Sequence, residues 1–179
     1  MVYLFLANGF EEIEALTPLD VLRRAGVPVT TVGVGGDSIL GAHGIRVQAD
    51  IPDTMYRDSA PDMIILPGGM PGSMNLDESR VVDAALRAAV RNDAYICAIC
   101  AAPMVLVKRG YLEGKRAVCY PGFEQYLMGA DVTDARVECD GKVITSKGMG
   151  AALEFGLALV EALCGKNEAE RIGNAVFAK

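Results

Sequence analysis

Cys100 is the side chain in this sequence whose type and position best fit a nucleophile. It follows the apolar run 94–98, which predicts a strand, and precedes 101–109, which predicts a short helix. A residue in such a sharp strand-to-helix turn presents its side chain at the edge of the sheet. The helix N-terminus would stabilise a thiolate there and lower the pKa of Cys100. An inert buried thiol is the alternative, and small alanine neighbours favour the tight turn.

The other cysteines have weaker claims to chemistry. Cys97 and Cys100 have the Cys-x-x-Cys spacing of redox motifs, but Cys97 falls inside the predicted strand, so we expect its side chain in the core. Cys119 ends a neighbouring predicted strand and could reach the same sheet edge as a resolving thiol, although a core thiol is the favoured interpretation. Cys139 and Cys164 are expected to be structural.

Glu14 is the acid most suited to work with the cysteine. Glu11, Glu12 and Glu14 open the first predicted helix, where acidic residues complement the helix dipole. Glu14 lies about one turn in, on the helix face of Pro18 and Val21, which we expect to be partly buried. A carboxyl buried there would have a raised pKa and could donate a hydrogen bond to a thiolate. A simple capping role is the alternative.

A proline and two glycines, Pro67-Gly68-Gly69, follow the predicted buried strand 63–66. Glycines let the backbone approach a ligand and leave N–H groups free to stabilise an oxyanion. The alternative is an ordinary turn that ends a strand. The segment has neither the Gly-x-Gly-x-x-Gly fingerprint nor the Lys-Ser/Thr of a phosphate-binding loop, so nucleotide binding is not predicted.

Composition limits the classes of protein that this chain can belong to. It has 179 residues, of which 51% are hydrophobic and 22% charged, with 17 Lys and Arg against 23 Asp and Glu. The net charge of −6 and the lack of a basic run argue against binding nucleic acid or anionic membranes. Five cysteines without a signal peptide favour the cytoplasm. The longest apolar run, 94–107, is too short to span a bilayer.

The elements that must position these residues alternate along the chain. Apolar runs predict strands at 2–7, 27–34, 63–66, 94–98 and 117–119 and hairpins at 39–48 and 136–146. Helices are predicted at 11–25, 78–90, 101–109 and 151–163, with a helical turn at 123–128 and a last helix from Lys166. This alternation implies a parallel sheet covered on both faces. Ligands bind beyond the carboxyl ends of such strands, which points to the loops 8–14, 67–75 and 99–103.

Four segments in this order carry a family resemblance: GFEEIEA (9–15), LPGG (66–69), AICAAP (98–103) and TSKGMG (145–150). They resemble the ThiJ/PfpI superfamily, and within it the DJ-one subgroup of the Parkinson-disease protein and its bacterial relatives. The resemblance covers essentially the whole chain. It implies a single domain over 1–179 with a flavodoxin-like, three-layer α/β sandwich and a mostly parallel sheet, as in class I glutamine amidotransferases. It also implies a homodimer without metal or organic cofactor.

The resemblance also implies roles for particular residues. Cys100 matches the reactive cysteine, Glu14 the protonated glutamate that hydrogen-bonds it, and Gly69 and Ala101 the backbone N–H donors. The implied activity is that of a cysteine-dependent glyoxalase or deglycase with a stress-protective role, acting on a small aldehyde, a dicarbonyl or its adducts. The alternative is a non-enzymatic oxidative-stress sensor or holding chaperone that works through oxidation of Cys100.

Two departures from the family pattern concern histidine. Tyr120, before Pro121, stands where the Parkinson-disease protein has a histidine, and Ala101 stands where protease-like members have one. A Cys–His pair is therefore missing at both family positions, which makes a peptidase unlikely. Glu14 would manage proton transfer, helped by Tyr120 or water, with weaker turnover than in histidine-bearing relatives.

His43 is the single histidine of the chain, which excludes any mechanism that needs two and leaves a zinc site only scattered cysteines. It aligns with a family arginine near the dimer interface, so it could reach the site of its own or of a partner subunit. An exposed histidine at the tip of a hairpin is the alternative.

Overall fold

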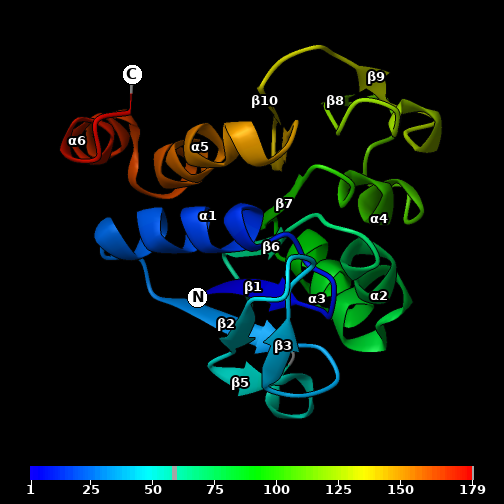
Figure 1. Ribbon diagram of the computed structural model, residues 1–179. Coiled ribbons are helices and arrows are strands. Elements are labelled where there is room, and N and C mark those ends of the chain that lie inside the picture. Colours follow the sequence, from blue (N-terminus) through cyan, green and yellow to red (C-terminus); the bar gives the residue numbers. More distant parts are fainter. Residues whose placement is uncertain (58–59, 179) are drawn as a thin grey trace.

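The computed structural model describes residues 1–57 and 60–178. In this part of the chain, seven strands form one sheet in the order β10-β11-β7-β6-β1-β2-β5 (Figure 1). The strands are β1 (Val2–Leu6), β2 (Val29–Gly33), β5 (Ile51–Pro52), β6 (Met63–Leu66), β7 (Tyr95–Ile99), β10 (Val137–Asp140) and β11 (Val143–Ser146). Neighbouring strands run parallel except in the hairpin of β10 and β11. The predicted, mostly parallel sheet is confirmed.

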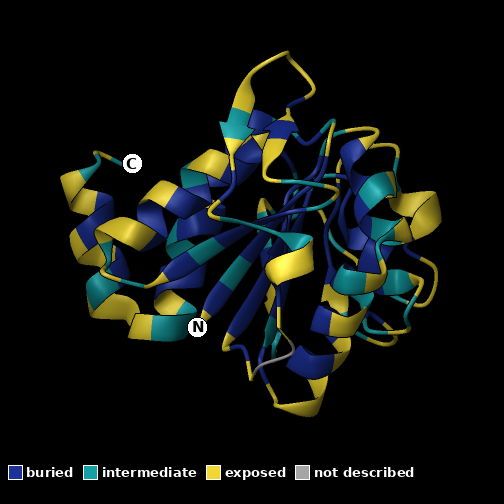
Figure 2. Ribbon diagram, turned by 90° about the horizontal axis from the view of Figure 1, so that it is seen from below, coloured by how far each residue is buried: buried dark blue, intermediate teal, exposed yellow. Residues whose placement is uncertain are grey.

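Apolar side chains on both faces of the strands explain why helices cover the sheet on two sides. All of β6 is buried, with Met63 and Ile65 in one core and Ile64 and Leu66 in the other. The first core is closed by α1 (Glu12–Arg24), α5 (Ala152–Cys164) and α6 (Lys166–Ala175), the second by α2 (Gly72–Glu78), α3 (Arg80–Arg91) and α4 (Pro103–Val107). Figure 2 shows the buried residues gathered along the sheet and the helix surfaces turned towards it. The predicted three-layer α/β sandwich is confirmed.

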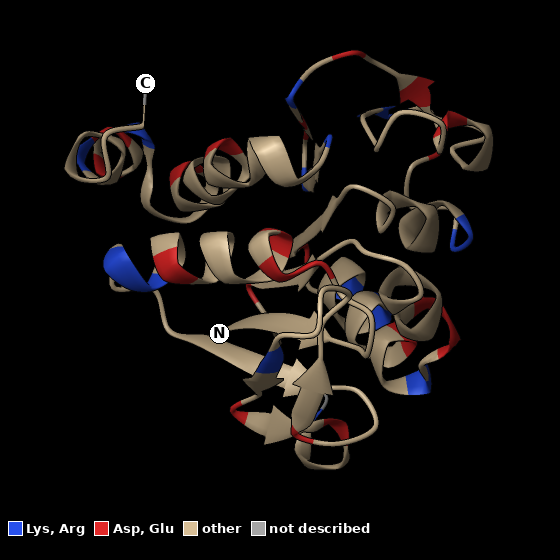
Figure 3. Cartoon of the chain, in the orientation of Figure 1, with Lys and Arg blue, Asp and Glu red and all other residues tan. Residues whose placement is uncertain are grey.

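Charges at the two ends of α1 match its dipole. The Glu11 side chain caps the helix by accepting a hydrogen bond from the Glu14 N–H at 2.8 Å. Glu12 and Glu14 lie in the first turn and Arg23 and Arg24 in the last (Figure 3), as the macrodipole favours. This cap fixes where the helix begins, and so which face of it carries Glu14.

A hairpin of β3 (Ser38–Leu40) and β4 (Arg46–Gln48) lies outside the main sheet, as predicted for 39–48. It docks on the segment between β1 and α1. The Gly9 N–H donates to the Leu40 carbonyl at 2.8 Å, and the Ala42 N–H donates to the Phe10 carbonyl at 2.8 Å. The hairpin thereby holds the loop that leads into Glu14.

Two predicted segments near the site differ from the structure. The predicted loop 67–75 is a loop only as far as Pro71, because residues 72–78 form α2. The Pro71-Gly72 pair is typical of a turn and hid this helix, whose Ser73 and Leu76 side chains are buried. The helix predicted at 101–109 is the shorter α4, which begins at Pro103, a residue favoured in a first helical turn.

The smaller elements agree with the predictions only in part, since the helical turn predicted at 123–128 contains η2 (Glu124–Tyr126) but the others were displaced or not predicted. The strand expected at 117–119 is β8 (Arg116–Ala117), and it pairs with the unpredicted β9 (Asp131–Val132) apart from the main sheet. The N–H of Val118 donates instead to the Thr145 Oγ1 at 2.9 Å, which ends the pairing. Single 3₁₀ turns are η1 (Asp53–Met55), η2 (Glu124–Tyr126) and η3 (Met149–Ala151). In the described residues, none of the helices is sufficiently long and apolar to cross a membrane.

Candidate functional site

Cys100 occupies the predicted turn between β7 and α4. Its φ of +64° lies in the left-handed region, which costs a residue with a Cβ roughly 1–2 kcal/mol. The surrounding backbone holds this conformation, because the Cys100 N–H donates to the Ser146 carbonyl and the Tyr120 N–H donates to the Cys100 carbonyl, each at 2.9 Å. The side chain is only half-buried, at the carboxyl edge of the sheet. This is the geometry expected for a nucleophile elbow.

Glu14 comes from α1 to the same place, with only 1% of its surface exposed. Gly68 lies between the two groups. A methyl group on Gly68 would stand 2.3 Å from the Glu14 Oε2 and 2.5 Å from the Cys100 Cβ, so only a glycine lets them converge. Among the described residues, Glu14 Oε2 has no hydrogen-bond partner of standard geometry. A buried carboxylate oxygen of this kind is costly, which favours the protonated acid.

The ionisation of Glu14 and Cys100 is coupled. Burial raises the pKa of Glu14 to about 7, against the lowering effect of hydrogen bonds with Cys100, Gly68 and Met149. Burial and the charge of Glu14 raise the pKa of Cys100 to about 12, although the N–H groups of Gly69 and Ala101 lower it. The predicted lowering of the Cys100 pKa is therefore wrong as a net direction, because burial and an ionised neighbour outweigh the two N–H groups.

Because the two groups are coupled, Cys100 and Glu14 share a single proton over a range of pH. Between its two titrations the pair holds one proton, which either group can carry. When Glu14 carries the proton, its negative charge is gone and only the two favourable N–H groups face the sulfur. Within the one-proton state, movement of the proton from Cys100 to Glu14 gives a thiolate without loss of a proton to water.

The two predicted N–H donors, Gly69 and Ala101, come from two different loops, and both lower the pKa of Cys100. Gly69 has a φ of +90°, and a methyl group there would stand 2.4 Å from the Glu11 nitrogen and 2.6 Å from the Gly9 carbonyl oxygen. The neighbouring Gly68 carbonyl accepts a hydrogen bond from the Glu11 N–H at 2.9 Å. These contacts fix the loop after β6 against the loop after β1, so the Gly69 N–H is preorganised.

Tyr120 lies on the rim of the site. Its side chain is 49% exposed, and its ring approaches Gly148 so closely that a methyl group there would stand 3.2 Å from the Tyr120 Cδ2 and 3.8 Å from the Glu14 Oε1. The ring lines an open hollow of about 250 Å³ together with Pro121, Arg136 and residues 147–151. The structure brings this predicted auxiliary residue next to Cys100 and Glu14.

His43 is placed elsewhere. Its side chain is 70% exposed, with Nδ1 2.9 Å from the Glu12 Oε2, and its N–H donates to the Glu12 Oε1 at 2.8 Å. Hydrogen bonding to Glu12 raises the pKa of His43. Glu11, Glu12 and His43 bring potential metal ligands within 4.8 Å of one another, but both oxygens of the buried Glu12 already accept hydrogen bonds from the hairpin. Within this chain, His43 anchors the hairpin tip to α1.

The remaining cysteines are separated between the two cores and the surface. Cys119 is 3% exposed in the core on the α2–α4 side, where burial raises its pKa to about 11. Cys97 is fully buried in the other core, as expected from its place in the strand. Cys139 and Cys164 are exposed, contrary to a purely structural role. All five are free thiols.

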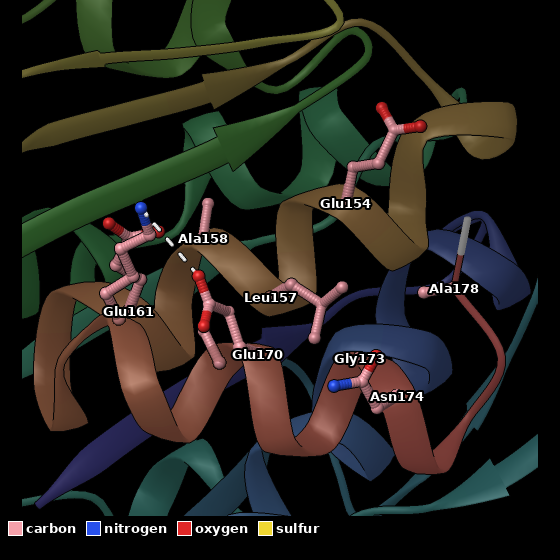
Figure 4. Close-up of a pocket in the computed structure, with 10 residues that line it drawn as sticks. Glu154, Leu157, Ala158, Glu161, Glu170, Gly173, Asn174 and Ala178 are labelled. Carbon is pink, nitrogen blue, oxygen red and sulfur yellow. Dashed lines mark ion pairs between the residues drawn. The ribbon is translucent and has the colours of Figure 1, made fainter.

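A second hollow lies away from this chemistry. It measures about 550 Å³ and separates α5 from α6 (Figure 4). Acidic side chains surround it, including Glu154, Glu161 and Glu170, and the last of these pairs with Lys166 at 3.7 Å. No cysteine lines it, and its lysine, Lys166, is paired with Glu170, so the candidate site is the Cys100 edge.

The residues whose roles the sequence did not reveal are all backbone contributors. Gly68 supplies the space between thiol and carboxyl and an N–H for Glu14, and Met149 supplies another N–H for Glu14. Gly148 supplies the narrow gap between Tyr120 and Glu14. The sequence features that could have pointed to these roles are the two glycines after β6 and the Gly148-Met149-Gly150 run. Glycine marks places where backbones and ligands approach closely.

Comparison with known proteins agrees with this geometry. The profile of the DJ-1/PfpI family matches residues 1–162. Protein DJ-1 homolog B of Arabidopsis thaliana is 39% identical over 170 residues, which are 93% of this chain but 39% of that protein. Protein dj-1beta of Drosophila melanogaster is 38% identical over 178 residues, 96% of this chain and 94% of that protein. The glutathione-independent glyoxalase DJR-1.2 of Caenorhabditis elegans is 36% identical over 157 residues, 87% and 83% of the two chains.

The solved structures agree as well. The crystal structure of Drosophila melanogaster DJ-1beta superposes with a TM-score of 0.95 at 35% identity, covering 99% of this chain and 97% of that one. The shared fold is the α/β type of class I glutamine amidotransferases, with a mostly parallel central sheet flanked by helices. The resemblance noted in the sequence is confirmed.

Proposed function

The chain belongs to the DJ-1/PfpI family, and from this membership we propose that it is a cofactor-free, cysteine-dependent enzyme of the glyoxalase or deglycase kind. The observation that carries the proposal is the convergence of the Cys100 thiol and the buried Glu14 carboxyl across Gly68, and it is supported by the N–H groups of Gly69 and Ala101, which lower the pKa of the thiol. The substrate class is a reactive dicarbonyl such as methylglyoxal, or its adducts.

The first steps follow from the coupled pair. Glu14 takes the thiol proton, and the Cys100 thiolate adds to the aldehyde carbon. The carbonyl electron pair moves to oxygen as the C–S bond forms. The sulfur then loses its negative charge. The N–H groups of Gly69 and Ala101 are therefore available to donate hydrogen bonds to the new oxyanion. Glu14 returns its proton to that oxygen, which gives a hemithioacetal.

Glu14 then transfers a second proton between carbons. Its carboxylate removes the proton from the former aldehyde carbon, and the electron pair moves through an enediol towards the neighbouring carbonyl. The hydroxyl proton of the first carbon passes to the enediolate oxygen on the second carbon. Glu14 then delivers its proton to the second carbon as the carbonyl re-forms on the first, which gives a thioester of a 2-hydroxy acid. Water hydrolyses the thioester, and Cys100 departs as a thiolate. The balance is one dicarbonyl plus one water to one hydroxy acid, without an external oxidant.

Formation of lactate from methylglyoxal tests this proposal directly. We expect Cys100→Ser to abolish lactate formation, measured by proton NMR. Cys139→Ser, which changes an exposed thiol outside the site, should retain it and is the matched control. Lactate formed at the parental rate by Cys100→Ser would overturn the proposal.

A second candidate is a non-enzymatic oxidation sensor or holding chaperone. The favouring observation is the same pair of N–H groups at the Cys100 sulfur, which would also stabilise a sulfinate. Mass spectrometry after mild peroxide treatment separates the two roles. A sensor gains two oxygens at Cys100 before the exposed Cys139 and Cys164 are oxidised, and it turns over no methylglyoxal.

We also propose that the chain acts as a homodimer in the cytoplasm, with a small aldehyde as its ligand. Ile13 and Ile45 are 46% and 53% exposed beside Glu12, where α1 meets the hairpin. Apolar surface of this kind is typical of an interface between subunits. Light scattering should give a dimer mass, and Ile13→Glu should lower it to that of one chain.

A further inference from the structure

The hollow beside Tyr120 adjoins the surroundings of the reacting pair, although neither Cys100 nor Glu14 lines it. The Tyr120 N–H donates to the Cys100 carbonyl at 2.9 Å. The backbone N–H of Met149, a residue that also lines the hollow, lowers the pKa of Glu14. The bare backbone of Gly148 separates the Tyr120 ring from the Glu14 carboxyl. Tyr120 and Gly148 therefore belong both to the wall of the hollow and to the surroundings of the reacting pair.

The wall of this hollow is mostly apolar, in spite of two basic residues. Arg136 is held by Glu154, with Nε 2.6 Å from Oε2, and it also donates to the Gly150 carbonyl. Lys147 is paired with Asp134. Both cations already have acidic partners. An anionic substituent would therefore find little positive charge in the hollow that is not already neutralised. Tyr120, Pro121 and Ala151 provide the apolar surface.

The hollow is also large enough for a substrate substituent bigger than a methyl group. An apolar cavity of roughly 150 Å³ holds a benzene molecule, and this hollow measures about 250 Å³. A methyl substituent would leave most of it filled with water. An aromatic ring would displace that water and could stack against the Tyr120 ring.

We propose that the hollow is a specificity subsite, and that the substrates this site favours are 2-oxoaldehydes with an uncharged aromatic or branched apolar arm. The inference rests on the proposed function and names the substrate class of the same site. Tyr120 is then a specificity-determining wall of the subsite, and its hydroxyl takes no part in proton transfer.

The test compares phenylglyoxal with methylglyoxal, measured as mandelate and lactate. We expect the wild-type kcat/KM to be roughly tenfold or more higher for phenylglyoxal, the scale of discrimination typical of apolar pockets. Tyr120→Phe keeps the ring and should keep this ratio. Tyr120→Ala removes the ring and should bring the ratio near one. A purely structural role of Tyr120 would lower both rates together and leave the ratio unchanged.

The outcomes separate this inference from the proposed function. Methylglyoxal turnover without a preference for phenylglyoxal, or with a ratio insensitive to Tyr120→Ala, overturns the subsite alone. If neither substrate reacts, the proposed function fails, and the subsite is tested with acetophenone, an apolar ketone that lacks the aldehyde. Acetophenone should slow alkylation of Cys100 by iodoacetamide in the wild type and Tyr120→Phe. Equal protection in Tyr120→Ala would overturn the subsite.

Discussion

Gly68 shows most clearly how single residues determine this site. The thiol and the carboxyl come from distant parts of the chain, and they meet only because no side chain stands between them. Cys100 and Glu14 themselves could be singled out from the sequence, since one occupies an elbow and the other a helix face above the sheet edge. The net direction of the Cys100 pKa could not, because it depends on burial and on the charge of Glu14.

Gly68→Ala should therefore disable the site without a change in charge. The added methyl group would overlap the Glu14 Oε2 and the Cys100 Cβ, and one of the two groups must move. A displacement of about 1 Å in a catalytic group can cost roughly 100-fold in rate, so we expect at least that loss in methylglyoxal turnover. Gly173→Ala in α6 is the control, since its added methyl group would stand 3.6 Å from the Leu157 Cδ1, an ordinary van der Waals contact away from the site. Equal activities of the two variants would contradict this account.

The coupled pair also predicts the pH profile of Cys100 reactivity. Burial raises the pKa of Glu14 to about 7, and above this pH the pair holds the single proton that allows thiolate formation by internal transfer. Alkylation by iodoacetamide should rise as pH increases through about 7 and then level off. Glu14→Gln removes the internal base, so its profile should lack this step and rise only in alkaline solution. A wild-type profile with a single step near 8.5, the value of an ordinary thiol, would refute the coupling.

Among the elements, those with strong local patterns were predictable and those defined by tertiary contacts were not. β6 and β7 are uninterrupted apolar runs, and α1 has helical periodicity with suitable end charges. The short helix α2 follows Pro71-Gly72, and it is stabilised by burial of Leu76, a long-range effect. Likewise, the hairpin tip was predictable as a turn, but its attachment to the buried Glu12 was not.

The attachment of the hairpin should depend more on Glu12 than on His43. Glu12 is 3% exposed and accepts the N–H groups of His43 and Ile45 at 2.8 and 3.4 Å. Glu12→Ala leaves these donors unpaired, which typically costs about 1–3 kcal/mol, and should speed hydrogen exchange of both amides. His43→Ala keeps the backbone bonds. Its effect should be confined to acidic pH and fade as pH rises through the raised pKa of His43, because only the charged ring strengthens the pair. Faster exchange in His43→Ala than in Glu12→Ala would contradict this ranking.

At the scale of the whole molecule, the site follows from the order of the strands. The chain builds β1, β2 and β5 on one side and then crosses to β6, β7 and β11 on the other. The first turn of α1, which carries Glu14, and the loops that carry Gly69 and Cys100 therefore meet at the carboxyl edge where the direction changes, as in other open α/β sheets. The parallel sheet and this edge could be predicted from the alternation of elements. The hollow beside Tyr120 could not, since it depends on how segments 120–121 and 147–151 pack together.

The stability of the folded chain should carry the signature of the buried Glu14. Its folded-state pKa is raised from 4.5 to about 7, so its contribution to stability is fully present below about pH 4.5 and is lost as pH rises to 7. This shift corresponds to about 3 kcal/mol. Compared with Glu14→Gln, the wild type should lose roughly this much unfolding free energy between pH 4.5 and 8, measured in urea. The exposed Glu78→Gln variant is the control and should follow the wild type. Parallel curves for the wild type and Glu14→Gln would refute the expectation.

The left-handed backbone at Cys100 is needed for activity but lowers the stability of the folded chain. A residue with a Cβ at φ +64° and a buried acid across from it both destabilise the native state, and they lie within a few atoms of each other. Substitutions that remove either feature should raise the free energy of unfolding and lower the activity. Selection for heat tolerance alone should therefore replace residues at this edge of the sheet first. If the left-handed Cys100 and the buried Glu14 both persist under such selection, the thiol must contribute to function.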